Sequence, residues 1–180
     1  MDELQRAEFS QTLVQSFPLV DNHPDIAGLL RDGDLLGRLG PGMAGGFVES
    51  GITKVLAPEA RGPVLGALVA EFLHAGLVLI RKEGRNHPGA DTHFRSEAIW
   101  NGEREHFQSR SFDLVETDCV LVVDDWITTG NTIRTAKDFV LSAGAEYVGA
   151  SVIVNKTSQA CLEELGVRWL VNFSDLNSYS

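Results

Sequence analysis

The chain alternates short apolar runs with longer segments of helical periodicity. The apolar runs are typical of buried strands and predict strands at 54–58, 77–80, 119–123, 147–154 and 167–171. Segments with apolar positions on one helical face predict helices at 2–17, 62–75, 133–143 and 159–165. Because strands alternate with helices, we expect an α/β fold with a parallel sheet, formed as a single domain.

Three segments interrupt this alternation. Residues 17–34 are rich in turn-forming residues and predict irregular structure, and residues 34–49 predict a helix broken or kinked near 40–42. Residues 83–113 are polar and lack helical periodicity. Within them the Asn-Gly pair at 101–102 is the preferred dipeptide of a tight type I′ turn, which predicts an exposed β-hairpin.

The strongest candidate chemistry lies where the predicted strand 119–123 ends. Asp124 and Asp125 follow at once, at the edge where open α/β sheets bind ligands. A short loop then leads into the next helix, and such a loop offers backbone N–H groups, hydroxyls and a favourable dipole to a phosphate. Its residues are Thr128, Thr129, Gly130, Asn131 and Thr132.

This segment, 119–132, resembles the phosphoribosyl-pyrophosphate (PRPP) motif of the type I phosphoribosyltransferases. That motif has four apolar residues, two acids, a short spacer and then Thr-Gly-x-Thr. In this chain it stands as VLVV at 120–123, the two aspartates, the spacer at 126–128 and Thr-Gly-Asn-Thr at 129–132. The resemblance implies that Asp124 and Asp125 hold the ribose hydroxyls and, through water, Mg²⁺. It implies that residues 128–132 cradle the 5-phosphate. It also implies one phosphoribosyltransferase domain over 1–180, in a Rossmann-like fold with a parallel sheet.

Two further segments resemble the pyrophosphate side of the family, and the adenine-type group in particular. The first predicted strand ends in an Ala-Arg-Gly loop at the start of a helix. The second ends in an Arg-Lys pair, which is followed by a basic residue and then by Pro-Gly. The resemblance implies pyrophosphate binding by Glu59, Ala60, Arg61, Gly62 and Arg85. It implies that Arg81 and Lys82 neutralise the leaving pyrophosphate, as paired cations suit that charge.

The resemblance also implies the lid and the base site. Residues 1–33 would form an N-terminal helix and a small hood, and 83–113 a flexible catalytic hairpin that closes over PRPP. Candidates for contacting the base are Leu30, Arg31 and Trp126.

The match is weakest at the hairpin. Adenine enzymes carry Glu-Tyr-Gly there, whereas this chain has no acid at the matching place. Glu97 is our candidate catalytic acid, and Glu103 is an alternative.

We therefore expect transfer of a phosphoribosyl group from PRPP to a nucleobase, with release of pyrophosphate. An adenine-like purine is the first candidate for the base. A pyrimidine of the orotate type, or a base from specialised metabolism, remains an alternative. So does a non-catalytic sensor of PRPP or nucleotides, because some proteins of this fold regulate transcription.

Charge and composition indicate which classes of partner and which compartment to expect. The net charge of −10 disfavours non-specific nucleic-acid binding. Two cysteines without metal-ligand spacing predict core thiols in a reducing compartment. With no apparent signal peptide or membrane span, we expect a cytoplasmic protein that does not bind membranes. The family likeness also implies a homodimer.

Two motif matches carry no function in this reading. The glycines of 40–45 have the G-x-G-x-x-G spacing of a dinucleotide loop, but no strand is predicted before them. The apolar run and two acids at 120–125 also fit a Walker B strand. That assignment needs a G-x-x-x-x-G-K-[ST] loop, which the chain lacks.

Overall fold

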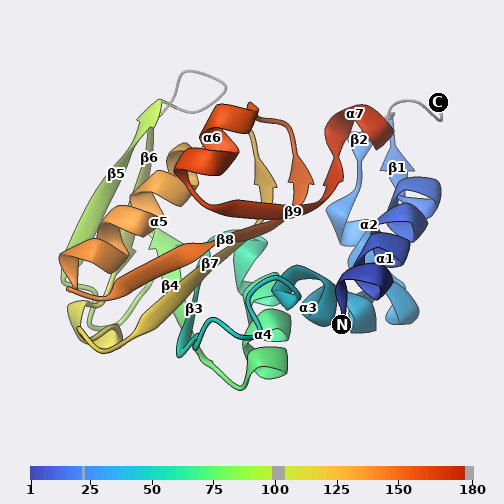
Figure 1. Cartoon of the computed structure of the whole chain (residues 1–180). Coiled ribbons are helices and arrows are strands. Elements are labelled where there is room, and N and C mark those ends of the chain that lie inside the picture. Colours follow the sequence, from blue (N-terminus) through green and yellow to red (C-terminus); the bar gives the residue numbers. More distant parts are fainter. Residues whose placement is uncertain (22, 99–103, 177–180) are drawn as a thin grey trace.

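A seven-stranded sheet organises the computed structural model, which describes residues 1–21, 23–98 and 104–176 (Figure 1). The strand order is β5-β6-β4-β3-β7-β8-β9, parallel from β4 to β9 and antiparallel on the β5-β6 side. The strands are β3 (Lys54–Pro58), β4 (Gly76–Lys82), β5 (Thr92–Ala98), β6 (Arg104–Ser109), β7 (Cys119–Ile127), β8 (Glu146–Asn155) and β9 (Val167–Asn172). All five predicted parallel strands are confirmed.

Helices cover both faces of this sheet, and the central strand β7 contributes to both cores. Leu121 and Val123 pack into one cluster with α3 (Gly33–Ala44) and α4 (Gly62–Leu73). Val120 and Val122 pack into the other with α5 (Asn131–Ser142) and α6 (Gln159–Glu164). This two-sided burial explains why the strand is an unbroken apolar run.

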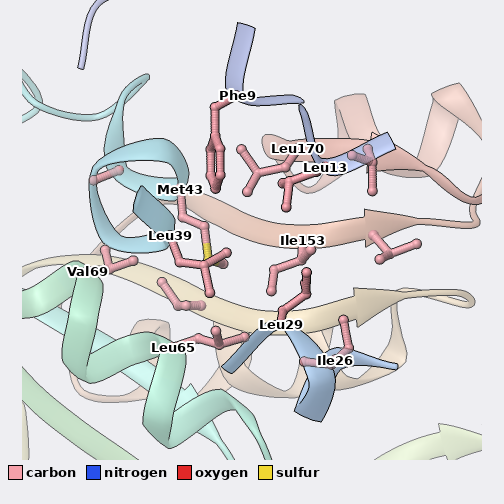
Figure 2. Close-up of a cluster of buried hydrophobic side chains, with 14 of the residues drawn as sticks. Phe9, Leu13, Ile26, Leu29, Leu39, Met43, Leu65, Val69, Ile153 and Leu170 are labelled. Atoms are coloured by element: carbon pink, nitrogen blue, oxygen red, sulfur yellow. The ribbon is translucent and has the colours of Figure 1, made fainter. Parts of the chain in front are cut away.

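The predicted N-terminal helix is α1 (Glu3–Ser16), which starts with a capping box between Asp2 and Gln5. Figure 2 shows Phe9 and Leu13 of α1 pointing into the core beside Leu170 of β9. Both side chains are fully buried. The helix therefore docks on the sheet through these two side chains.

The segment after α1 is more ordered than we expected. Residues 17–34 contain a two-stranded ribbon, β1 (Leu19–Val20) with β2 (His23–Pro24), and the short helix α2 (Ile26–Arg31). The prediction of irregular structure was wrong because α2 is stabilised by tertiary packing of its buried apolar residues. Figure 1 places α1, α2 and the ribbon at one end of the sheet beside α7 (Phe173–Leu176), so both chain ends build this cap.

Helix α3 runs unbroken through residues 40–42, where the sequence predicted a break or a kink. The helix runs through Pro41, which lies in its last turn, and ends at Ala44. The neighbouring glycines permit close packing: a Cβ on Gly40 would lie 2.5 Å from the carbonyl oxygen of Leu68, and one on Gly42 2.7 Å from the Phe9 ring. The G-x-G-x-x-G spacing thus serves helix packing, as its lack of a preceding strand indicated.

The predicted hairpin is present as β5 and β6, but its base belongs to the main sheet. β6 pairs with the end of β4 through Arg81 and Lys82, and Phe107 is buried. The ring of Phe94 meets that of Phe139 on α5 edge-on, with centroids 5.1 Å apart. The expected exposed insertion is therefore a continuation of the sheet, because this apolar contact ties it to α5. The Asn-Gly turn at 101–102 lies outside the described residues.

Both cysteines have free thiols, and only one of them matches the prediction of a core thiol. Cys161 on α6 is buried, whereas Cys119 at the start of β7 is partly exposed. Desolvation and the nearby Glu146 carboxylate raise the pKa of Cys119.

Candidate active site

Asp124 and Asp125 lie at the carboxyl end of β7, within the strand. β7 continues beyond the predicted end at residue 123 because it stays paired with β8 as far as Ile127. Its pairing with β3 ends at Val122. On the β3 side the two aspartates therefore stand past the last strand pair, next to the start of α4.

The predicted pyrophosphate loop meets the aspartates directly. Arg61, at the N-terminus of α4, directs its Nε onto the Oδ2 of Asp125. A Cβ on Gly62 would lie 3.2 Å from the carbonyl oxygen of Val123 and 3.4 Å from Oδ1 of Asp124, so glycine lets this loop approach β7 closely. The peptide bond between Glu59 and Ala60 in the same loop is cis. The structure thus brings together two motifs that sequence reasoning assigned separately.

Burial and mutual repulsion set the electrostatics of the aspartate pair. Only 9% of Asp124 and 8% of Asp125 is exposed. Burial, and then the charge of Asp125, raise the pKa of Asp124 well above its ordinary range. Asp125 has the Arg61 guanidinium as a counter-charge. Hydroxyl donors or a hydrated cation would therefore relieve a concentrated negative charge at this point.

The predicted phosphate loop turns from β7 into α5 at the same edge. Gly130 takes a left-handed backbone conformation (φ 78°), which glycine adopts without strain. The Oγ1 of Thr129 accepts a hydrogen bond from the backbone N–H of Asn131 at 3.3 Å. Thr129 is exposed, and Thr128, Asn131 and Thr132 are partly exposed. The loop thus presents hydroxyl groups to solvent at the N-terminus of a twelve-residue helix.

Glu59 ties the pyrophosphate loop to the end of β4. Its Oε1 accepts hydrogen bonds from Arg81 Nε at 3.2 Å and Nη2 at 2.9 Å, and its Oε2 accepts one from the backbone N–H of Lys82 at 3.0 Å. Partial burial raises the pKa of Glu59, but the bonds from Arg81 and Lys82 outweigh it and hold the pKa below its usual value. Glu59 therefore orients Arg81 at the end of β4.

Glu105 is a carboxylate near the site that sequence reasoning missed. The register of β5 and β6 shifts between Arg95 and Ala98, which leaves two residues of β5 opposite Glu105. The Oγ of the buried Ser96 accepts a hydrogen bond from the backbone N–H of Glu105 at 2.9 Å. Such a bulge redirects side chains, and here the Glu105 carboxylate contacts Lys82 Nζ.

Glu105 is also close enough for its charge to add to the raised pKa of Asp124. The acid proposed from the sequence, Glu97, has an exposed side chain, and Glu103 lies outside the described residues. No local pattern marks Glu105, because its placement depends on the bulge. Arg85, at the start of the same polar segment, is exposed close to Lys82, whose carbonyl oxygen accepts its N–H at 3.2 Å.

The residues predicted to contact the base are only partly brought together. Trp126 is half-buried beside Phe173 of α7, with ring centroids 5.7 Å apart, and Lys156 Nζ lies 4.2 Å from the Phe173 centroid. Leu30 packs against the same apolar cluster as Trp126. Arg31 is different: its exposed side chain pairs with Asp25 at 3.5 Å.

Arg31 lines a surface groove between α1, α2 and α3, together with Thr12 and Arg38. None of the predicted phosphate, ribose or pyrophosphate residues lines that groove. Within the described residues, the structure therefore places Leu30 and Trp126 on one core and Arg31 on an outer surface.

Comparisons with known proteins identify the family. The family model described as "Phosphoribosyl transferase domain" matches residues 44–168. An adenine phosphoribosyltransferase of Symbiobacterium thermophilum is 36% identical over 80% of this chain and 79% of its own length. One from Streptomyces clavuligerus is 37% identical over 72% of this chain and 71% of its own.

A solved structure shows the same architecture. The crystal structure of adenine phosphoribosyltransferase from Rhodothermus marinus superimposes with a TM-score of 0.78 at 26% identity, over 93% of this chain and 99% of that one. The family model covers more than half of the chain, including β3, β4, β7 and the loops that follow them. The chain therefore belongs to the phosphoribosyltransferase family.

Proposed function

We propose that this protein transfers the 5-phosphoribosyl group from PRPP to adenine and releases pyrophosphate. The carrying observation is the contact between Arg61 and Asp125, which unites the pyrophosphate loop and the PRPP motif at one sheet edge. The relatives at 36% and 37% identity are named adenine phosphoribosyltransferases, which favours adenine among the bases.

In this proposal PRPP lies along the carboxyl edge of the sheet. Asp124 and Asp125 accept hydrogen bonds from the ribose hydroxyls, and the partly exposed loop 128–132 cradles the 5-phosphate at the start of α5. The pyrophosphate lies against the loop 59–62 and the cations at the end of β4. Those cations are Arg81, Lys82 and Arg85.

Three candidate pyrophosphate ligands are held by carboxylates in the free protein. Arg61 pairs with Asp125, Arg81 with Glu59, and Lys82 with Glu105. Binding of PRPP would therefore exchange partners: pyrophosphate oxygens take Arg61 and Lys82, and the ribose hydroxyls take the released Asp125. The cations are in place before substrate arrives, which reduces the reorganisation needed on binding.

The transfer breaks the bond between ribose C1 and the pyrophosphate oxygen and forms a bond from a base nitrogen to C1. The proton of that nitrogen is released, and the leaving pyrophosphate is a base that can take it. Positive charge develops on the ribose next to Asp124 and Asp125, while negative charge grows on pyrophosphate next to Arg61 and Lys82. Because both charges meet an oriented opposite charge, the site stabilises the transition state more than the ground state.

The aspartate pair also fits Mg²⁺, which prefers carboxylate oxygens and keeps several waters. Among the described residues, no group of three or more His, Cys, Asp or Glu side chains could hold a metal ion. This suits a cation that arrives with PRPP and meets Asp124 and Asp125 through water. When bound, Mg²⁺ supplies positive charge that offsets the charge of the pyrophosphate.

The base would lie between the hairpin and the cap. Trp126 and Phe173 offer an aromatic surface for a heterocycle. Glu105 is the described hairpin carboxylate whose charge reaches Asp124, so we propose it in place of Glu97 as the hairpin acid. This role requires the carboxylate to come within hydrogen-bond reach of the base when the hairpin closes.

The proposed partners are PRPP and adenine. No helix in the described part of the chain is long and apolar enough to cross a membrane. The acidic net charge of −10 favours neither nucleic acid nor an anionic membrane surface. We also propose a homodimer and a cytoplasmic location by family likeness, and light scattering after gel filtration tests the dimer.

The proposed function is tested by pyrophosphate release from PRPP and Mg²⁺ with a panel of bases: adenine, guanine, hypoxanthine, uracil and orotate. Release that depends on adenine supports the proposal. Release that depends on another base supports transferase activity but shows that the substrate is that base and not adenine. Binding of PRPP without release for any base contradicts catalysis and supports a sensor.

A further inference from the structure

Arg134 lies behind the phosphate loop and is part of none of the motifs above. It stands in the first turns of α5, and its Nη1 donates hydrogen bonds to the carbonyl oxygen of Thr129 at 2.9 Å and to Oδ1 of Asn131 at 3.0 Å. One guanidinium nitrogen thus joins the two residues that flank Gly130. The contact fixes the loop where the chain changes from strand to helix.

Glu164 at the end of α6 orients this guanidinium. Its two carboxylate oxygens accept from Arg134 Nε at 2.9 Å and Nη2 at 2.8 Å, a two-point pair between residues 30 apart in sequence. The hydrogen bond from Arg134 is the main cause that lowers the pKa of Glu164. A two-point pair of this kind fixes the plane of the guanidinium as well as its position.

Stability alone does not account for a cation at this place. The N-terminus of a helix carries partial positive charge, which disfavours an arginine there. The pair with Glu164 is half-exposed on the Glu164 side, and such pairs contribute little to folding. The contacts to Thr129 and Asn131 therefore point to a local role in the loop.

Helix α6 also packs against the phosphate loop. A Cβ on Gly130 would lie 2.7 Å from Sγ of Cys161 and 3.0 Å from Leu165, so α6 packs directly under the loop. With its carbonyl oxygen bound to Arg134, Thr129 does not direct that negative dipole at an incoming phosphate. The loop hydroxyls, and the backbone N–H groups other than that of Asn131, remain to face the anion.

We propose that Arg134 and Glu164 are positioning residues that hold the loop 128–132 in the shape that binds the 5-phosphate. Neither side chain touches the phosphate in this arrangement: Arg134 acts on the loop, and Glu164 acts through Arg134. The inference rests on the proposed function, since it assigns this loop to the 5-phosphate of PRPP.

The test compares ligands that use different parts of the site. Calorimetry in Mg²⁺ measures the Kd of PRPP, of ribose 5-phosphate and of pyrophosphate for the wild type and for Arg134→Ala. We expect about tenfold weaker binding of the two ligands with a 5-phosphate, from losing charge-assisted hydrogen bonds to the loop. Pyrophosphate should keep its Kd within about twofold, because loop 59–62 is unchanged.

Two further variants sharpen the result. Glu164→Gln keeps the fold of α6 and weakens the orientation of Arg134, so it should show the same ligand pattern to a smaller extent. It also serves if Arg134→Ala fails to fold. The double variant Arg134→Ala with Glu164→Gln should be no worse than Arg134→Ala alone, because Glu164 acts through Arg134.

Lys137→Ala is the matched control. Lys137 lies one turn further along α5, carries the same charge, and has its Nζ 5.1 Å from the Tyr147 ring centroid. Its removal should leave all three Kd values unchanged. In turnover, Arg134→Ala should raise the KM for PRPP about tenfold with kcat and the KM for the base nearly unchanged.

Two results would overturn the inference: unchanged binding of ribose 5-phosphate in Arg134→Ala, or equal weakening of all three ligands. The wild-type measurement separates a failure of this inference from a failure of the proposed function. A wild type that binds PRPP but does not turn over adenine removes the proposed substrate and leaves the ligand comparison valid. A wild type that binds neither PRPP nor ribose 5-phosphate refutes both.

Discussion

The guanidinium of Arg61 contacts the carboxylate of Asp125, which joins two loops whose residues are 64 apart in sequence. The contact sets the N-terminus of α4 against the end of β7. It also places a cation next to the two most buried carboxylates of the site, Asp124 and Asp125. The free protein therefore already holds opposite charges where PRPP would present pyrophosphate and a diol.

Replacing both aspartates should abolish turnover. Asp124→Asn with Asp125→Asn keeps the size of the side chains, removes both negative charges and replaces one acceptor oxygen of each carboxylate with an N–H donor. We expect kcat/KM for PRPP to fall by at least about a hundredfold. Steady-state kinetics measures the loss, and circular dichroism checks that the fold is kept. A folded double variant with near-native turnover would contradict the assignment.

Asp124 should make folding stability fall as pH rises. Its pKa is raised in the folded state by burial and by Asp125, so its contribution is fully present below the unfolded pKa of about 3.9. That contribution is lost as pH rises through the raised folded pKa. Asp124→Asn should therefore be more stable than wild type at pH 8, by about 1 kcal/mol or more, with a smaller gain near pH 5.

Glu59 should make folding stability depend on pH in the opposite direction. Its pKa is lowered, so the stability it contributes is present above its unfolded pKa and lost in acid. Glu59→Gln should lower the Tm at neutral pH and match wild type at low pH. Thermal unfolding of both variants from pH 4 to 8 makes the comparison. A Tm gain for Asp124→Asn that does not grow with pH would refute the account of its charge.

Glu105 should matter more than Glu97. Glu105→Gln loses the ion pair to Lys82 and the proposed acid, whereas Glu97 lies within the bulge of β5 with an exposed side chain. We expect kcat to fall about a hundredfold in Glu105→Gln and to change little in Glu97→Gln. The pH profile of kcat should also change only in the first variant. The reverse ranking would return the role to Glu97.

Gly130→Ala tests the shape of the phosphate loop. A side chain there meets both a left-handed backbone (φ 78°) and the Cys161 sulfur at 2.7 Å. We expect a loss of about 2–3 kcal/mol in unfolding free energy and weaker PRPP binding. Gly51→Ala is the control, because Gly51 also has a positive φ (64°) but open space around its Cβ position. It should cost about 1 kcal/mol and leave PRPP binding unchanged.

The sequence predicted those parts of the fold that depend on local pattern. The strand at 54–58 matches β3 to the residue, and the helix starting at 62 is α4, because their apolar spacing and loop residues are local signals. The motif 119–132 also placed the aspartates and the phosphate loop at one sheet edge. β7 runs four residues further than predicted, to Ile127, because pairing with β8 continues past the apolar run.

The remaining features depend on contacts between distant residues. α2 exists because Ile26 and Leu29 are buried in the cap, which no local periodicity of six residues could show. Glu105 approaches Lys82 through a bulge, and Arg134 meets Glu164 across 30 residues. Without a three-dimensional arrangement, those charged residues resemble any solvated surface charge.

The most direct test of the central claim is formation of AMP from PRPP, adenine and Mg²⁺, measured by chromatography for the wild type beside the double aspartate variant. The account predicts AMP and pyrophosphate in equal amounts from the wild type, and neither from the folded variant. Wild-type protein that binds PRPP yet forms no AMP would contradict it.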